Sequence, residues 1–335
     1  MSAEDVLLLT AEDVRKLLTM DECIAAVERA FRLYGEGKAC PPAVLSMHAP
    51  NGTFHVKSGM LSLSRPYFAA KVNGNFPDNR TRFGLPTIQG MIVLCDAERG
   101  IPLAVMDSRE ITSLRTGAAT AVAARYLARP DSHIATICGC GEQGRVQLKM
   151  LARVSRLQAV FAHDLDQGRA AAFAEELSED LGISVTRTAD LSSAVRQSDI
   201  CVTCTTSRRP LLNANDVLPG AFIAAVGADN PEKQELHPDL MAKSKVVADT
   251  LDQCAAMGDL HHALEAGAVS RAEIFAELGE VVAGKKPGRE SDAEIIVFDS
   301  TGMALQDVAA AAVVYENFTR AGGHSAIRAL GEVAS

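Results

Sequence analysis

The most constraining feature of the chain is a glycine motif, Gly139-Cys140-Gly141-Glu142-Gln143-Gly144. It follows an apolar run at 133–138 and precedes a segment, 143–154, whose apolar spacing predicts a helix. In this context Gly139 permits a tight turn, Gly141 lets backbone approach a pyrophosphate, and Gly144 allows close packing of helix on strand. The N–H groups at the start of the helix favour an anion. The motif therefore predicts a dinucleotide site, and the alternative is a glycine-rich turn in another nucleotide-binding or ligand-free fold.

The sequence around this motif predicts an α/β domain. Short β-branched runs alternate with amphipathic stretches, which is typical of a parallel sheet wound with helices. The expected strands are 133–138, 157–163, 184–187, 200–205, 222–226, 245–249 and 295–298, and the expected helices are 143–154, 169–181 and 191–196. We expect a Rossmann-type doubly wound parallel sheet as the NAD-binding domain, residues 113–304.

The acid that follows the second expected strand bears on the choice of cofactor. A carboxylate there can bond the hydroxyls of the adenine ribose and repel a 2′-phosphate. Asp164 holds this place and favours NAD over NADP, with Asp166 as the second choice.

The remaining residues predict a second domain that is discontinuous in sequence. Residues 12–34 have the spacing of one amphipathic helix, and residues 68–72, 90–95 and 102–106 are strand-like. An Ala-rich helix at 303–319 cannot bury its apolar face alone, so we expect it to return to this unit. The prediction is an α+β substrate-binding and dimerisation domain made of residues 1–112 and 305–335.

Charge and apolar patterning exclude some classes of partner. The formal charge of −9 and the lack of a basic cluster argue against nucleic acid. No apolar run approaches the roughly 20 residues of a membrane helix, and the acidic start of the chain does not resemble a signal peptide. We expect a cytoplasmic protein. Cys201 and Cys204 form a C-x-x-C without a second zinc-spaced pair, so we expect no metal site and reduced structural thiols, with a redox pair as the alternative.

Several polar residues stand where strands end or helices begin. Arg115 and Thr116 lie near the start of an Ala-rich helix, where a guanidinium and free N–H groups can hold a carboxylate or phosphate. Lys71 lies in an apolar run and needs an anionic partner, either a ligand or an internal ion pair. Asp229 follows an expected strand at the edge where ligands of such sheets bind, and either shuttles protons or caps a turn.

Two other sets of residues can be explained by a structural role as well as by a functional one. Asp299 and Ser300 end a strand before the helix at 303–319, so either can be its N-cap. His261 and His262 have no ligand-spaced partners and are expected on the surface or in packing.

Together these residues resemble the ornithine cyclodeaminase, alanine dehydrogenase and mu-crystallin family over nearly the whole chain. The resemblance rests on a set of short motifs spread along the sequence. They are Lys71-Val72-Asn73 with Pro77 and Asn79, Leu85-Pro86-Thr87, Pro102 to Asp107, Thr112 to Ala119, the glycine motif, Gly227-Ala228-Asp229, Lys233 to Leu236, Gly279-Glu280-Val281, Phe298 to Gly302, and Gln306-Asp307.

The resemblance implies roles for particular positions. Lys71 and Arg115 would hold the substrate carboxylate, and Asp229 would handle protons or the attacking water. The residues implied to line the cofactor are Thr87, Arg115, Thr116, Gly141, Gln143, Asp164, Thr205, Val226, Lys233 and Ser300. The resemblance also implies a homodimer built through the α+β domain and hydride transfer at an amino acid α-carbon.

Two differences from the family pattern indicate which branch of the family this chain resembles. Ala43 stands where members commonly carry Arg or Lys, and Lys57 is the nearest basic replacement. His55 stands near the place where ornithine-cyclising members have an acid for the distal ammonium, so ornithine or lysine is disfavoured, because burying an unpaired ammonium costs roughly several kcal/mol.

The leading interpretation is an NAD-dependent amino acid dehydrogenase or imine reductase of alanine dehydrogenase type. Its substrate would be a small amino or imino acid, with aspartate or iminosuccinate considered because His55 and Lys57 can meet a second carboxylate. The alternatives are an ornithine cyclodeaminase and a mu-crystallin-like ketimine reductase or binding protein.

Overall fold

The structure is a computed structural model that describes residues 6–322 and 326–327. The chain divides into two compact units: unit 1 is residues 1–115 with 303–335, and unit 2 is residues 116–302. These boundaries fall after Arg115 and Gly302, where the sequence analysis placed them after residues 112 and 304. Arg115 thus groups with Lys71 in unit 1.

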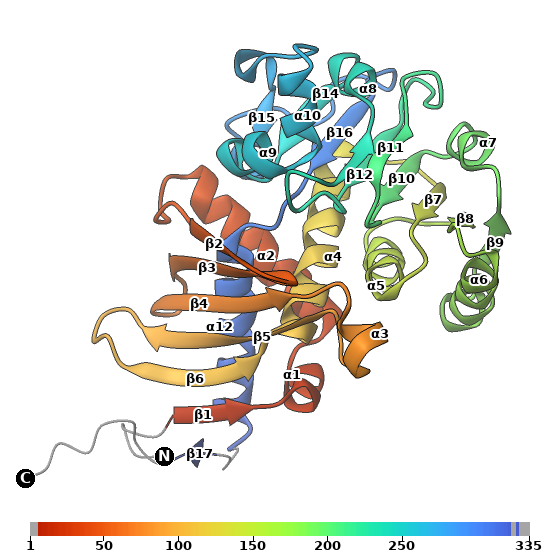
Figure 1. Cartoon of the computed structure of the whole chain (residues 1–335). Helices are drawn as coiled ribbons and strands as arrows, with labels where there is room; N and C mark the ends of the chain where they lie inside the picture. The colour runs from red at the N-terminus through yellow and green to blue at the C-terminus, as the bar shows by residue number, and fades with distance from the viewer. Residues whose placement is uncertain (1–5, 323–325, 328–335) are drawn as a thin grey trace, which may run out of the picture. The chain divides into compact units, whose positions relative to one another are not determined.

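Unit 2 contains the Rossmann-type parallel sheet that the sequence predicted (Figure 1). In the described part of the chain it has eight strands in the order β15-β14-β16-β12-β10-β7-β8-β9. Their bounds are β7 Ile134–Cys138, β8 Ala159–His163, β9 Ser184–Thr188, β10 Ile200–Thr203, β12 Phe222–Ala225, β14 Lys245–Ala248, β15 Ala276–Glu277 and β16 Ile296–Asp299. Chain order changes direction between β7 and β10, and ligands of open α/β sheets bind at the carboxyl ends of strands at such a point.

In unit 2, whose residues are all described, helices alternate with strands from β7 to β10, no helix separates β10 from β12, and two helices follow β14. The helices are α5 Glu142–Leu151, α6 Gln167–Leu181, α7 Leu191–Val195, α8 Pro238–Ala242, α9 Leu251–Met257, α10 Asp259–Glu265 and α11 Leu278–Val282. A two-stranded parallel ladder joins β11 Arg208–Leu212 to β13 Gln234–Leu236. The central strands β10, β12 and β16 are buried along their whole length. This explains their continuous apolar sequences, because a sheet covered on both faces removes the need for alternation.

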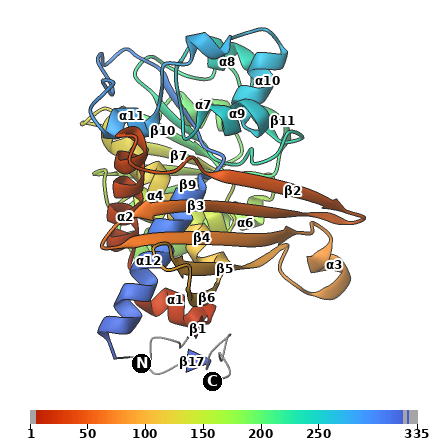
Figure 2. The ribbon, with the colours of Figure 1, turned by 90° about the vertical axis from the view of Figure 1, so that its left-hand side faces the viewer.

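Unit 1 is built on a mixed sheet whose described strands run in the order β17-β1-β6-β5-β4-β3-β2. Their bounds are β1 Val6–Leu9, β2 Ala43–Ala49, β3 Gly52–Ser62, β4 Pro66–Asn75, β5 Ile88–Asp96, β6 Pro102–Asp107 and β17 Ala326–Ile327. The helices are α1 Ala11–Leu17, α2 Met20–Gly35, α3 Asn79–Phe83 and α12 Ala304–Arg320, while α4 Ser108–Leu127 begins in this unit. Figure 2 shows β2 to β5 as neighbouring strands with α12 beside them.

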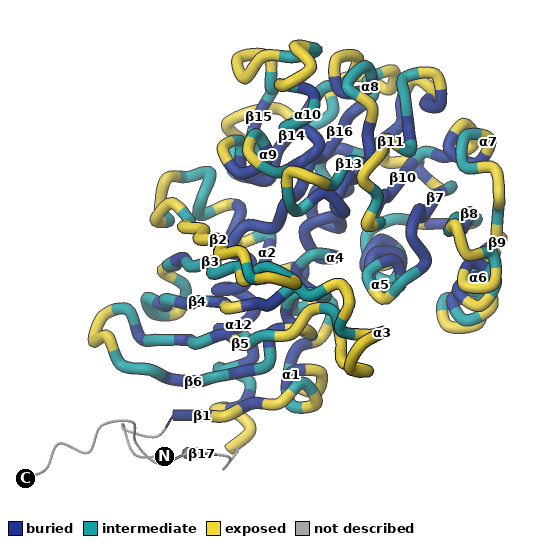
Figure 3. Tube along the Cα trace, viewed as in Figure 1, coloured by how far each residue is buried: buried dark blue, intermediate teal, exposed yellow. Residues whose placement is uncertain are grey.

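One face of this sheet is covered and the other is not. Helix α12 packs on α2, β3 and β4, and a Cβ at Gly59 would lie 2.7 Å from Leu305 Cδ2, so glycine permits the close approach. On the opposite face, Leu45, Val56, Val72 and Met91 stand directly opposite one another across four strands. The β2 strand is exposed along almost all of its length (Figure 3).

The expectation of one helix over residues 12–34 is wrong. Two helices form, because Thr19 accepts a hydrogen bond from the Glu22 amide and the Glu22 carboxylate accepts one from the Thr19 amide. This capping box starts a new helix after Leu18, which has an extended backbone. Among the described residues, no helix combines the length and apolar character needed to span a membrane.

Candidate active site

The three glycines of the motif in unit 2 have three separate physical roles. Gly139 has a φ of +105°, which side chains rarely tolerate, and a Cβ there would also lie 2.8 Å from the Cys204 carbonyl oxygen. A Cβ at Gly144 would lie 2.1 Å from the Gly139 carbonyl oxygen, so this position brings α5 onto the loop. At Gly141, the N-cap of α5, a Cβ would meet no atom within 4 Å. The loop therefore has open space at the helix N-terminus, where a pyrophosphate fits.

Asp164 connects the end of β8 to this glycine loop. Its carboxylate accepts hydrogen bonds from the amides of Cys140 at 3.0 Å and Asp166 at 2.9 Å. Asp166, the second choice for the ribose, instead caps α6 by accepting from the amides of Gly168 and Arg169. The Arg169 guanidinium lies 3.6 Å from the Asp164 carboxylate.

A buried carboxylate that the sequence reasoning missed organises the loops after β10 and β12. Glu235 accepts hydrogen bonds from the Thr203 hydroxyl, from the Thr205 amide and hydroxyl, and from the Gly227 amide, at 2.6–2.9 Å. Burial raises the pKa of Glu235 although these donors oppose the shift. Thr205 is itself a predicted cofactor residue and Gly227 follows another, Val226, so Glu235 fixes the backbone at both places. The sequence signal that could have identified this carboxylate is its place in the motif Lys233 to Leu236, which also contains the predicted cofactor residue Lys233.

Asp229 forms an ion pair at the carboxyl edge of the unit 2 sheet. Lys233 Nζ lies 2.7 Å from Asp229 Oδ1, and Asn230 also donates to this oxygen at 3.3 Å. The Asp229 side chain is 42% exposed, so solvent reaches the carboxylate. The backbone of Lys233 is held in turn, since its carbonyl oxygen lies 2.8 Å from His262 Nε2.

The interpretation of Asp299 or Ser300 as the N-cap of the helix at 303–319 is wrong. Helix α12 has Met303 as its N-cap and no side-chain cap. Asp299 instead accepts from the amides of Asp259 and Leu260 at the start of α10, and Ser300 donates to the Asp249 carboxylate at 3.0 Å. Burial raises the pKa of Asp299 to about 7.

In the C-x-x-C segment Cys201 is buried and Cys204 is partly buried, and both cysteines are free. Cys201 packs in the apolar core of unit 2, and Cys204 donates to the carbonyl oxygens of Cys138 and Gly139. Burial raises the pKa of both thiols above the ordinary range, which disfavours the reactive thiolate.

In unit 1 the structure joins Lys71 and Arg115 through a carboxylate to which the sequence reasoning assigned no role. Asp307 Oδ1 accepts from Lys71 Nζ at 2.9 Å and from Arg115 Nε at 3.0 Å, and its Oδ2 lies 2.8 Å from Lys71 Nζ. Lys71 also donates to the Thr112 hydroxyl, and Arg115 to the side-chain oxygen of Gln306. Each of the three charged side chains is at most 6% exposed. With Lys71 protonated, the trio carries a net charge of +1, which suits an anionic ligand.

The other two predicted substrate residues extend this polar face of the sheet. Lys57 on β3 stands directly opposite Lys71 on β4, and His55 stands opposite Asn73. Paired residues of antiparallel strands share a face, so the four side chains lie on one side. The His55 ring bonds the Ser46 hydroxyl at 2.9 Å. His55 and Lys57 both lie within strand β3.

The remaining predicted cofactor residues lie on different elements. Gln143 is in the first turn of α5, Val226 follows β12, and Thr116 is in α4. Thr87 precedes β5 in unit 1, where its carbonyl oxygen accepts from the Phe76 amide.

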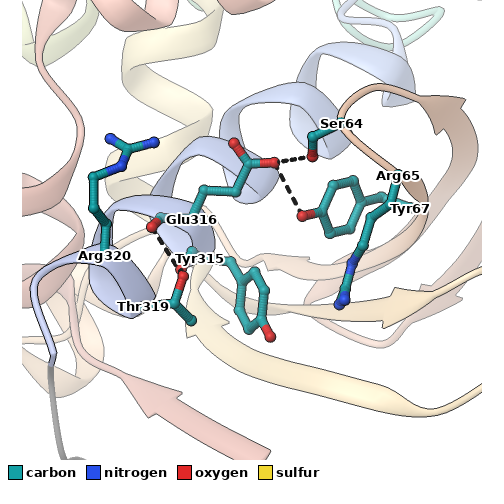
Figure 4. Close-up of a pocket in the computed structure, with 7 residues that line it drawn as sticks. All are labelled: Ser64, Arg65, Tyr67, Tyr315, Glu316, Thr319 and Arg320. Carbon is teal, nitrogen blue, oxygen red and sulfur yellow. Dashed lines mark hydrogen bonds between the residues drawn. The ribbon is translucent and has the colours of Figure 1, made fainter.

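A hollow of about 490 Å³ in unit 1 contains none of the predicted site residues. It is lined by residues of α12, the β3–β4 turn and the start of β4, including Ser64, Tyr67 and Glu316 (Figure 4). Glu316 accepts hydrogen bonds from Ser64 and Tyr67, so its carboxylate is already engaged in local structure.

Comparisons with known proteins agree on one family. The model of the ornithine cyclodeaminase/mu-crystallin family matches residues 4–322. The chain is 42% identical over 313 residues to an alanine dehydrogenase of Archaeoglobus fulgidus, covering 93% of this chain and 95% of the relative.

Two solved structures are also similar throughout. An archaeal alanine dehydrogenase dimer with bound NAD superposes with a TM-score of 0.92 at 42% identity, covering 97% of this chain and 99% of that one. The Δ1-pyrroline-2-carboxylate reductase of Thermococcus litoralis, in complex with NADH and L-proline, gives a TM-score of 0.90 at 35% identity, covering 96% and 100%.

Proposed function

The chain belongs to the ornithine cyclodeaminase/mu-crystallin family, and we propose that it is an NAD-dependent oxidoreductase acting on the CH–NH2 or C=N group of a small amino or imino acid. When bound, the nicotinamide supplies or accepts the hydride at the substrate α-carbon. Unit 2 is the proposed cofactor domain and unit 1 the proposed substrate-binding and dimerisation domain. The observation that carries the proposal is the buried trio of Lys71, Arg115 and Asp307.

The trio supports binding of an α-carboxylate for a simple electrostatic reason. Two buried cations on one carboxylate leave one unit of positive charge, and a carboxylate ligand neutralises it. Burial and the Arg115 guanidinium lower the pKa of Lys71 to about 7, while Asp307 opposes the shift. An anionic substrate favours the ammonium form in the same way. We therefore assign carboxylate binding to Lys71 and Arg115, with Lys57 and His55 as further contacts on the same face.

The residues of unit 2 fit the cofactor. The open space at Gly141 and the amides at the start of α5 would accept the pyrophosphate, and Asp164 would bond the adenine ribose. Thr205, Val226 and Ser300 follow strand ends held by the Glu235 and Asp249 carboxylates, and Gln143, Thr116, Thr87 and Lys233 complete the proposed lining. NADP is the less favoured cofactor.

We assign proton transfer to Asp229. Reduction of an imine adds a hydride to carbon and a proton to nitrogen, while oxidation of the amine is followed by attack of water on the imine and release of ammonia. A partly exposed carboxylate paired with Lys233 can accept and return these protons.

The unpartnered face of unit 1 supports a homodimer. Leu45, Met47, Phe54, Val72 and Met91 are each at least 39% exposed on the face that α12 leaves uncovered. A contiguous apolar surface across four strands is expected to be covered by a partner, and an alanine dehydrogenase similar to this chain is a dimer. We also propose a cytoplasmic location, supported by eight cysteines that are all free.

The test is a panel of nucleotide absorbance assays in both directions. NADH formation is measured at pH 7 and at higher pH with L-alanine, L-aspartate, L-ornithine, L-lysine and L-proline, and NADH oxidation with pyruvate or oxaloacetate plus ammonium. The proposal expects stoichiometric absorbance change with a neutral or acidic substrate, and its loss in Asp229→Ala with NADH binding intact. Ornithine converted to proline and ammonia without net NADH would establish the cyclodeaminase. Tight NADH binding without turnover of any substrate would indicate a binding protein.

A further inference from the structure

Asp307 is a buried carboxylate that lies at the start of a helix and contacts two cations. It lies in the first turn of α12, and the partial positive charge of a helix N-terminus favours an acid there. Its side chain is 3% exposed and contacts two cations from two different elements, Lys71 of β4 and Arg115 of α4. Burial alone would raise the pKa of Asp307, but Lys71 and Arg115 hold it below its usual value. Asp307 is therefore ionised at neutral pH.

The two cations depend on this carboxylate for both charge and orientation. Without it, an ammonium and a guanidinium would be buried side by side, and each would disfavour the charge of the other. A lysine chain has several rotatable bonds, and the contacts with Asp307 and Thr112 select one orientation of its ammonium. The bonds from Arg115 to Asp307 and Gln306, at 3.0 and 3.1 Å, orient the guanidinium plane in the same way.

We propose that Asp307 is a positioning residue of the substrate site, which holds Lys71 as an ammonium and aligns Lys71 with Arg115 for one carboxylate. The proposal rests on the proposed function, because it presumes that these cations bind the substrate. Asp307 itself makes no contact with substrate in this account. Its contribution reaches the reaction through the two cations.

The inference has a direct readout that does not require catalysis. Protein labelled with ¹³C at lysine Cε is titrated by NMR, and the Lys71 resonance is assigned by its absence in Lys71→Met. Asp307→Asn should lower the titration midpoint of Lys71 by at least about one pH unit, because the main group that favours the ammonium is removed. An unchanged midpoint would overturn the proposal whether or not the protein turns over any substrate tested.

Steady-state kinetics of two variants then distinguish the position of the Asp307 carboxylate from its charge. With the substrate found in the panel, Asp307→Asn should raise KM by about 30-fold or more and shift the alkaline fall of kcat/KM to lower pH. Asp307→Glu keeps the charge but moves the carboxylate, so it should raise KM while leaving the pH profile in place. It also provides a folded comparison if the amide variant folds poorly. Equal KM and pH profiles in all three proteins would refute positioning.

A matched control exists on the same helix. Glu316→Gln changes an acid to an amide further along α12, where the carboxylate bonds Ser64 and Tyr67. It should leave the Lys71 midpoint and KM unchanged. NADH affinity, measured by fluorescence titration, should be the same in all variants. A Glu316→Gln effect equal to that of Asp307→Asn would mean that helix packing, not the carboxylate at 307, produces the change.

Discussion

Asp307 accepts a hydrogen bond from Lys71 at 2.9 Å although the two residues are 236 positions apart in the sequence. The helix that carries Asp307 returns from the end of the chain to the first unit, and the strand that carries Lys71 lies under it. The discontinuous domain thus assembles a charged trio from segments that no local pattern connects.

Replacing Lys71 tests the binding of the substrate carboxylate. Lys71→Met nearly preserves the length of the side chain but removes its charge. KM should therefore rise by about 100-fold while NADH affinity is retained. In the wild type, kcat/KM should fall as pH rises above about 7, because the neutral amine no longer attracts a carboxylate. The control is Lys149→Met, which breaks a partly exposed ion pair with Asp180 in unit 2. An alkaline limb that persists unchanged in Lys71→Met would exclude Lys71 as its source.

Two glycines of the same loop should respond in opposite ways. Gly141→Ala places a methyl group in open space, so the free energy of unfolding should change by no more than about 1 kcal/mol. NADH affinity should fall about tenfold, because the methyl group enters the proposed pyrophosphate space. Gly144→Ala places Cβ 2.1 Å from the Gly139 carbonyl oxygen and should cost about 2 kcal/mol or more of stability. Denaturant unfolding and NADH titration measure the two effects. Equal losses of affinity and stability at both sites would contradict a ligand space at Gly141.

Asp164 and Asp166 should differ in their effect on cofactor choice. Asp164→Ser removes the carboxylate beside Arg169, which could then meet a 2′-phosphate, so the ratio of kcat/KM for NADPH over NADH should rise at least about tenfold. Asp166→Ser keeps an oxygen that can cap α6 and should leave that ratio unchanged. If Asp166→Ser changes the preference and Asp164→Ser does not, the assignment of the two acids is reversed.

The exposed face of unit 1 gives a prediction for the oligomer. Light scattering coupled to size exclusion should give twice the 35.5 kDa chain mass for the wild type and a single-chain mass for Met91→Glu, because the substitution buries a charge in the proposed interface. Leu165→Glu is the control, since Leu165 is 93% exposed in unit 2. A single-chain mass for the wild type would refute the homodimer.

Much of unit 2 was predictable because its signals are local. Buried parallel strands have continuous apolar sequences, and the glycine motif is a local signal for the turn after the first of them. The positions of the strands along the sequence could therefore be predicted from Ile134 onward. Unit 1 was harder. The break at Thr19 depends on a side-chain cap inside an otherwise continuous amphipathic pattern, and the β3 strand carries His55 and Lys57 among residues that do not alternate clearly.

The site was predictable in part, for a related reason. Lys71 and Arg115 were identified because a cation in an apolar context requires a partner, but the identity of that partner, Asp307, follows from tertiary structure. Glu235 was missed because a buried acid that receives four hydrogen bonds looks, in sequence, like any exposed glutamate.

The most direct test of the central claim follows the hydride itself. The wild-type protein is incubated with NADH deuterated at both hydrogens of nicotinamide C4, together with ammonium and either pyruvate or oxaloacetate, and the amino acid formed is analysed by mass spectrometry and NMR. The account predicts one deuterium on the α-carbon and one NAD⁺ formed for each amino acid. Amino acid without deuterium, or no reduction of any substrate while ornithine gives proline without net NADH oxidation, would contradict it.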